Sequence, residues 1–234
     1  MAVMHNPNYS TFPSSFQGTL LHATPLFEFE PDPPVHTVRF PGKSFSVLFS
    51  SEKRGPCAKE RVVKTLLGEL TRLEAHHGEI PANIPPFFSR GPLGQPLLHL
   101  RKNVGPHVSF TYDENQIWAS ISTQGHVGID VASPVEFMGY YPYARAFRGA
   151  EFRLAKGFCE GYPQRAAALL WSLKEATVKA FGCGFNLMAP LDIEAKSFRL
   201  WEKGLLFEMK AKEPVSAWAR PLGQAWLAIA LIES

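Results

Sequence analysis

The sequence lacks any run of apolar residues long enough to cross a membrane. No window approaches the roughly 18 such residues that a spanning helix needs. The N-terminus also lacks a basic segment followed by an apolar run, so we expect no secretion signal. These two absences predict a protein without a membrane-embedded part, and we expect it in the cytoplasm.

Cysteine is scarce. Cys57, Cys159 and Cys183 are odd in number and widely spaced. Such a set forms neither a disulfide framework nor a zinc site, which again favours a reducing compartment.

The chain also lacks a strong excess of charge of either sign. Its formal net charge is +3 at pH 7. That excess is too small to predict a nucleic-acid partner, and we expect none. A mild positive charge suits an anionic ligand or an acidic protein partner.

Proline divides the chain unevenly. Residues 1–43 hold seven of the 20 prolines, which excludes long helices and central strands and predicts an extended arm. Residues 44–124 and 125–234 each combine helical periodicity with short apolar strands, which predicts an α+β fold in two similar halves. A loop rich in proline and glycine is expected at 78–96. The expected helices are 59–75, 144–158 and 163–181, and the expected strands are 44–50, 108–112, 117–122, 127–131, 191–200, 205–211 and 224–232.

The most informative segment is Trp171-Ser-Leu-Lys-Glu-Ala-Thr-Val-Lys-Ala-Phe-Gly182. Glu175 and Lys179 are four residues apart, so they share one face of a helix with Trp171. Such a pair is most often a surface ion pair worth a few tenths of a kcal/mol. The segment is also suited to holding a metal beside a phosphate, and both interpretations are open at this point.

A short apolar run, Val127-Gly128-Ile129-Asp130-Val131, supplies a second carboxylate. An acid at the end of a strand often only caps the next turn. However, Mg²⁺ commonly takes one or two carboxylates and fills its other positions with water and phosphate oxygens. Asp130 and Glu175, on two different elements, would provide that pair.

Together these segments resemble the 4'-phosphopantetheinyl transferases of the surfactin type, the two-lobed branch of that superfamily. That family carries Gly-[Ile/Val]-Asp at a strand end and Trp-Ser-x-Lys-Glu-Ala-x-x-Lys on a helix. Weaker similarities extend the match to residues 44–232. They are Glu52-Lys53-Arg54 with Lys64-Thr65-Leu66-Leu67-Gly68, Gly94-Gln95-Pro96 in place of Gly-Lys-Pro, and Val108 to Tyr112 in place of a strand ending in Ser-His.

The resemblance implies an enzyme with two pseudo-equivalent lobes, 44–124 and 125–234, and an active cleft between them. Its reaction would be the Mg²⁺-dependent transfer of 4'-phosphopantetheine from coenzyme A to a serine of an acyl or peptidyl carrier protein, releasing 3',5'-ADP. Two lobes in one chain imply a monomer.

The resemblance also implies roles for individual residues. Asp130 and Glu175 would bind the metal, and Glu175 would also help to deprotonate the incoming serine. The remaining residues would contact coenzyme A: Lys179 and Lys174 at the pyrophosphate, Lys53, Thr65 and Thr111 near the 3'-phosphate, and Gln95 and Tyr112 at the positions of the family's lysine and histidine.

Three positions depart from the family. Ala132 replaces a second acid, and we consider Asp113 as its substitute. Tyr112 and Gln95 replace a histidine and a lysine, which predicts weaker nucleotide binding. These losses also allow an alternative, a non-catalytic descendant that binds a carrier domain or nucleotide without transfer.

Overall fold

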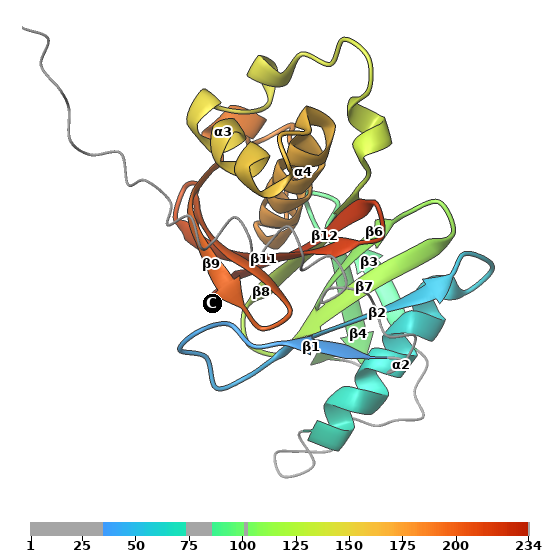
Figure 1. The fold of residues 1–234 in the computed structure, drawn as a ribbon. Coiled ribbons are helices and arrows are strands. Elements are labelled where there is room, and N and C mark those ends of the chain that lie inside the picture. Colours follow the sequence, from blue (N-terminus) through green and yellow to red (C-terminus); the bar gives the residue numbers. More distant parts are fainter. Residues whose placement is uncertain (1–34, 74–85, 101–102, 234) are drawn as a thin grey trace, which may run out of the picture.

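Strands from the two halves of the chain form two separate antiparallel sheets (Figure 1). The structure, a computed structural model, describes residues 35–73, 86–100 and 103–233. The first sheet has the order β1-β2-β7-β6 and the second the order β8-β12-β11-β10-β9, while β3, β4 and β5 form a small third sheet.

The strands of the first and third sheets are β1 His36–Val38, β2 Val47–Lys53, β3 Phe87–Arg90, β4 Pro96–Leu100, β5 Asn103–Val104, β6 His107–Tyr112 and β7 Gln116–Ser122. Those of the second sheet are β8 His126–Ala132, β9 Glu194–Trp201, β10 Gly204–Lys210, β11 Pro214–Leu222 and β12 Ala225–Ile232. The helices are α2 Ala58–Leu73, α3 Gly149–Phe158 and α4 Pro163–Ala180, with short 3-10 turns η2 Pro134–Phe137, η3 Tyr143–Arg145 and η4 Pro190–Asp192.

The two large sheets pack face to face, with α2 on the outer face of the first and α4 on the outer face of the second (Figure 1). The side chains of β12 point alternately to the two faces of the second sheet. Leu227, Ile229 and Leu231 fill the core between the sheets, while Ala228 and Ala230 face α4. Because successive side chains point to opposite faces, a strand buried on both sides is apolar throughout, and its small residues let the helix approach closely.

Glycine is required where α4 crosses β8. A Cβ atom on Gly128 would lie 1.9 Å from the carbonyl oxygen of Ala176 and 2.6 Å from the amide nitrogen of Ala180. The Gly-Ile-Asp segment is therefore a packing motif as well as a chemical one, because its glycine brings α4 against the strand that carries Asp130.

Most of the expected elements are present, and the mixture of helix and sheet agrees with the α+β class. The helix expected at 59–75 is α2, whose last expected residues lie outside the described part. The helix expected at 144–158 is wrong at its start: residues 143–145 form η3, and α3 begins only at Gly149, where Glu151 accepts a hydrogen bond from the Arg148 amide.

Three further expectations need correction. The expected loop 78–96 contains β3 within its described residues, and no strand was expected at β11. In addition, residues 36–38 of the expected arm form β1 and pair with β2, so this part belongs to the first sheet. The arm's residues 1–34 lie outside the described part.

Among the described residues, no helix is both long enough and apolar enough to span a membrane.

Candidate functional site

Asp130 and Lys179 meet where α4 packs against β8. The Lys179 Nζ donates hydrogen bonds to Asp130 Oδ1 at 2.7 Å and to the Ile129 carbonyl at 3.1 Å. The Thr111 hydroxyl, from β6 of the first sheet, donates to the same Oδ1 at 3.0 Å. Asp130 is buried, which raises its pKa, while Lys179 and Thr111 act in the opposite direction. A strand of the first sheet and the helix that covers the second sheet therefore hold this carboxylate in place.

Glu175 lies one helical turn before Lys179, on the face that the sequence predicted. Trp171, Glu175 and Lys179 are partly exposed, whereas the residues between them are buried. Within the described chain, the Glu175 carboxylate makes no hydrogen bond or ion pair. Burial raises its pKa, and the charge of Asp130 raises it further. The charge of Lys179 acts in the opposite direction, but the site holds a carboxylate without a hydrogen bond or ion pair among the described residues.

A third carboxylate, which sequence reasoning missed, comes from η2. Glu136 is exposed on η2, and its Oε1 accepts a hydrogen bond from the Ser133 amide at 2.7 Å. Partial burial of its carboxylate raises the pKa of Glu136, and the charge of Asp130 raises it further. The sequence did contain a signal for this carboxylate. Proline is common at the first position of a helical turn, and Glu136 closely follows Pro134 just after the expected strand.

Position 132, where the family carries a second acid, does not face the site. Ala132 is buried in the core beneath α4. Asp113 is not a substitute, because Oδ1 accepts from the Asn115 and Gln116 amides and Oδ2 accepts from the Trp118 indole at 2.7 Å. The structure uses Asp113 to shape the turn between β6 and β7.

The carboxylates suit a divalent cation that takes part of its ligands from a substrate. The charge of Asp130 raises the pKa of both Glu136 and Glu175, so a cation among these carboxylates would relieve their repulsion. Yet among the described residues no three His, Cys, Asp or Glu side chains are placed to hold a metal by themselves. A cation with few protein carboxylates and further oxygens from a phosphate or water is the arrangement that Mg²⁺ favours.

A cavity of about 690 Å³ opens beside this group. Lys179 lies on its wall, together with residues of β6 and of the turn after α4. Gly182 has φ +68°, a conformation that favours glycine, and it ends the helix so that the chain turns along the cavity. The Gln95 side chain also lines the cavity and lies about 3.6 Å from where a Cβ on Gly182 would be.

Tyr112 lines the same cavity and carries two cations over its ring. Arg54 is 5.1 Å and Lys59 is 5.8 Å from the ring centroid. Positive charge thus surrounds the tyrosine, although its own side chain brings none. The cluster of Arg54, Lys59 and Tyr112 also lines a second, smaller hollow at the start of α2.

Lys174 does not join this group. It is fully buried and donates to Glu151 Oε1 at 2.5 Å and to the carbonyls of Ala146 and Pro190. Glu151 in turn accepts from the Ala195 amide. Lys174 therefore belongs to a buried network of hydrogen bonds that connects α3, α4 and β9. Its ammonium group has no access to the cavity.

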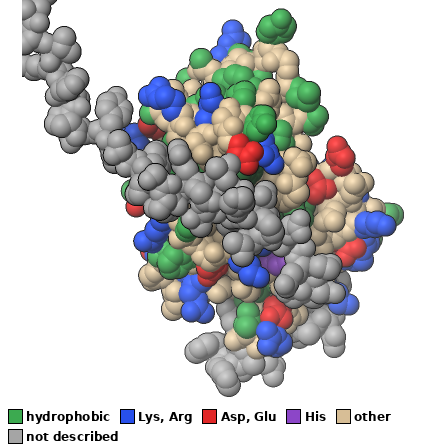
Figure 2. All heavy atoms as spheres, in the orientation of Figure 1, with side chains coloured by type: hydrophobic (Ala, Val, Ile, Leu, Met, Phe, Trp, Pro, Cys, Tyr) green, Lys and Arg blue, Asp and Glu red, His purple; other side chains and the backbone are tan. Residues whose placement is uncertain are grey.

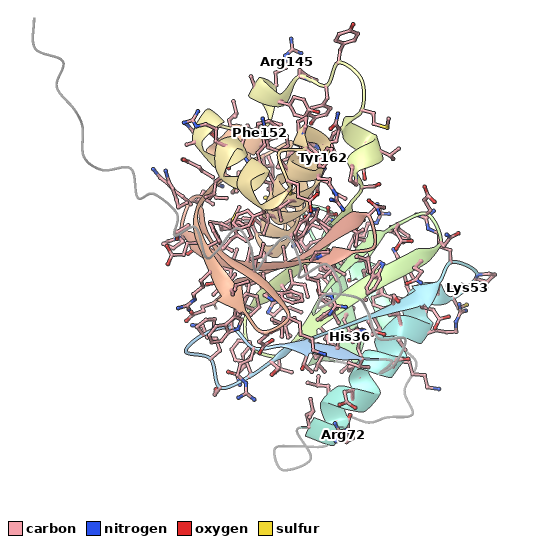
Figure 3. The ribbon with its side chains drawn as sticks, viewed as in Figure 1. His36, Lys53, Arg72, Arg145, Phe152 and Tyr162 are labelled. Carbon is pink, nitrogen blue, oxygen red and sulfur yellow. The ribbon has the colours of Figure 1, made fainter. Side chains whose placement is uncertain are left out.

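Lys53 and Thr65 are also separate from the cavity wall. Figure 3 places Lys53 at the outer end of β2, near α2. The Thr65 hydroxyl is on α2 and donates to the Arg61 carbonyl at 3.2 Å. Of the residues expected to contact coenzyme A, Gln95, Tyr112 and Lys179 line the cavity, and Thr111 lies behind it against Asp130.

Comparison with protein-family models gives a match that covers both carboxylate-bearing elements. Residues 126–229 match the 4'-phosphopantetheinyl transferase superfamily. The matched residues run from the start of β8 almost to the end of β12, so this superfamily match includes Asp130, Glu175 and Lys179. It leaves the first sheet unmatched and does not distinguish the surfactin-type branch. No curated protein matches the chain.

Proposed function

We propose that this protein transfers the 4'-phosphopantetheine arm of coenzyme A to a serine of an acyl or peptidyl carrier protein, releasing 3',5'-ADP. The observation that carries the proposal is the Asp130–Glu175–Lys179 group, whose Lys179 lines the cavity, within the segment that matches this transferase superfamily. The surfactin-type, two-lobed architecture is part of the proposal, since the two sheets would form its lobes.

Glu175 is suited to accept a proton. Its carboxylate makes no hydrogen bond or ion pair in the described chain, and burial with the nearby Asp130 raises its pKa, which makes it a better proton acceptor. In the proposed step the serine oxygen attacks the phosphorus that bears the pantetheine arm, and the bond from that phosphorus to the leaving 3',5'-ADP breaks. The hydroxyl proton passes to Glu175.

Lys179 is suited to orient the pyrophosphate, because its side chain reaches from the buried Asp130 to the cavity wall. Asp130 and Glu175, with Glu136 nearby, are the residues that would hold Mg²⁺. When bound, the cation would neutralise charge on the phosphate oxygens, the main requirement of phosphoryl-type transfer.

An exposed apolar segment supports a protein partner. Val135, Met138 and Tyr140 are exposed on the chain that follows β8, directly beside Glu136. Figure 2 shows hydrophobic and cationic side chains intermixed on the upper part of the molecule, where this segment and α3 lie. Exposed apolar side chains among cations fit an acidic carrier protein that must reach the site. We propose that a monomer suffices, because one chain supplies both sheets.

The test is the intact mass of purified apo carrier proteins after incubation with this protein, coenzyme A and Mg²⁺. Carriers of fatty-acid, polyketide and non-ribosomal peptide type are compared. We expect one of them to gain a single phosphopantetheine, and we expect EDTA to prevent the gain.

A carrier whose acceptor serine is replaced by alanine is the matched control and should gain nothing. If no carrier gains mass although coenzyme A binds, the transferase proposal fails in favour of a non-catalytic binding protein.

A further inference from the structure

The cavity beside the carboxylates is itself free of acidic side chains. Among the described residues that line it are three cations, Lys59, Arg90 and Lys179, two histidines, and no aspartate or glutamate. A concave wall of one charge sign concentrates ligands of the opposite sign. The cavity is therefore built for an anion, and its charge contrasts with the neighbouring carboxylates that suit a cation.

The two histidines come from different sheets and face each other. His107 begins β6 and His126 begins β8, and their ring centroids are 4.0 Å apart with an interplanar angle of 44°. Within the part of the chain that the structure describes, neither ring makes a hydrogen bond or an ion pair. Their ring nitrogens are thus available to a ligand, in contrast to His99, which is bonded to the Ser89 hydroxyl at 2.6 Å.

The surroundings of His107 favour its neutral form when no ligand is present. Burial lowers the pKa of His107, and the neighbouring His126 lowers it further. The other titratable groups that line the cavity are Lys59 from α2, Arg90 from β3, Tyr112 from β6, Lys179 from α4 and Cys183 after α4. A bound anion would favour the protonated form of an imidazole beside it.

We propose that His107 and His126 form a phosphate-binding pair, which takes up a proton when a phosphorylated ligand enters the cavity. Neutral imidazoles would donate and accept only weakly, whereas an imidazolium makes a charge-assisted hydrogen bond to phosphate. The pair supplies positive charge to a cavity in which Gln95 and Tyr112 are uncharged. The inference rests on the proposed function only for the identity of the ligand, coenzyme A.

Calorimetry measures the proton directly. Coenzyme A is titrated into the protein at pH 7, without divalent cations, in two phosphate-free buffers of different ionisation enthalpy. The phosphate of the ligand also titrates near this pH, so the protein's share is the difference between wild type and the His107→Gln/His126→Gln variant. We expect the variant to lose proton uptake and to bind about tenfold more weakly.

His99→Gln is the matched control, since His99 does not line the cavity, and it should behave as wild type. Dephospho-coenzyme A separates the two phosphate sources: retained uptake assigns the pair to the pyrophosphate, and lost uptake assigns it to the 3'-phosphate. Thermal unfolding checks that the double variant is folded, and ring-proton NMR titration of wild type with and without ligand provides a second measurement of the same protonation.

Equal proton uptake and affinity in wild type and double variant would overturn the pair. If wild type does not bind coenzyme A, the proposed function fails, and inorganic pyrophosphate then becomes the probe. Uptake with pyrophosphate that the double variant loses supports the phosphate pair on its own, and absence of uptake refutes it.

Discussion

Lys174 and Lys179 are five residues apart on one helix and serve different purposes. Lys174 is fully buried against Glu151, whereas Lys179 reaches the cavity from Asp130. The family resemblance predicted that both lysines contact the phosphate, because a sequence motif does not specify which face of the helix each residue occupies. The helical period of 3.6 residues places Glu175 and Lys179 together and turns Lys174 toward α3.

Replacing Lys174 should therefore affect the fold rather than the ligand. Lys174→Met leaves the Glu151 carboxylate buried without its cation, and we expect a loss of about 3–5 kcal/mol in the free energy of unfolding. Urea denaturation measures it. The control is Lys196→Met, because Lys196 pairs with Glu194 at 2.7 Å on the surface, where such a pair contributes about 1 kcal/mol or less. Equal losses in the two variants would contradict the structural role of Lys174.

Glu175 should show the opposite behaviour. Glu175→Gln keeps the shape and removes the charge, so we expect transfer to a carrier protein to fall by about 10²-fold or more. The free energy of unfolding should not decrease, since burial and Asp130 already disfavour this charge. Turnover is measured by intact mass and stability by thermal unfolding, with Glu208→Gln on the distant strand β10 as control. Near-normal turnover in Glu175→Gln would refute its assignment.

At the scale of elements, the turn η2 supplies the third carboxylate, Glu136, in place of an acid at position 132. Ala132 faces the core, but the chain turns at Pro134, and the Ser133–Glu136 hydrogen bond fixes a carboxylate within electrostatic reach of Asp130. The sequence comparison looked for the acid two residues after Asp130. The turn that follows the strand provides an acid, Glu136, six residues after Asp130.

The variant Glu136→Gln tests whether Glu136 takes the role expected of an acid at position 132. We expect Mn²⁺, used in place of Mg²⁺, to bind several-fold more weakly, because a carboxylate whose pKa the charge of Asp130 raises is lost. Binding is measured by electron paramagnetic resonance of free Mn²⁺, which does not depend on activity. Glu208→Gln again serves as control and should leave the affinity unchanged. Unchanged Mn²⁺ affinity in Glu136→Gln would exclude a role for this side chain at the cation.

The strands differ in how far they were predictable. β12 and α4 have strong local patterns, and the sequence located both within about a residue. β11 was missed because Pro214 and Pro221 lie at its ends and suggest a loop, although its partners β10 and β12 stabilise it on both sides. β3 depends likewise on pairing with β4, which a local pattern in a Pro- and Gly-rich segment does not reveal.

At the scale of the whole molecule, the site exists because β6 of the first sheet packs against β8 of the second. Thr111 reaches Asp130, the Ser109 hydroxyl accepts a hydrogen bond from the Ile129 amide, and His107 meets His126. Asp130 and Glu175 were predictable from motifs that lie within single elements, whereas Glu136 was not. The acid-free cavity and its histidine pair were not, because their members become neighbours only when the sheets pack.

The three carboxylates predict a pH dependence of cation binding that belongs to the whole assembly. Burial raises the pKa of Asp130, Glu136 and Glu175 in the folded state. Their contribution to stability is therefore fully present below the unfolded-state pKa values of about 4 and is lost as pH rises through the higher folded-state values. A divalent cation counters that loss, and protons compete with it at low pH.

We therefore expect Mn²⁺, without coenzyme A, to raise the unfolding temperature more at pH 7.5 than at pH 5. The measurement is thermal unfolding with and without Mn²⁺ across this range, for wild type and for the Glu136→Gln/Glu175→Gln variant. In the variant the pH dependence of the Mn²⁺ effect should be much weaker, because two of the competing proton sites are gone. A Mn²⁺ effect that is larger at pH 5, or equally pH-dependent in the variant, would mean that these carboxylates do not bind the cation. Since the histidine pair favours its phosphate at low pH and the carboxylates favour their cation at high pH, the two halves of the site should bind their ligands together best between these limits.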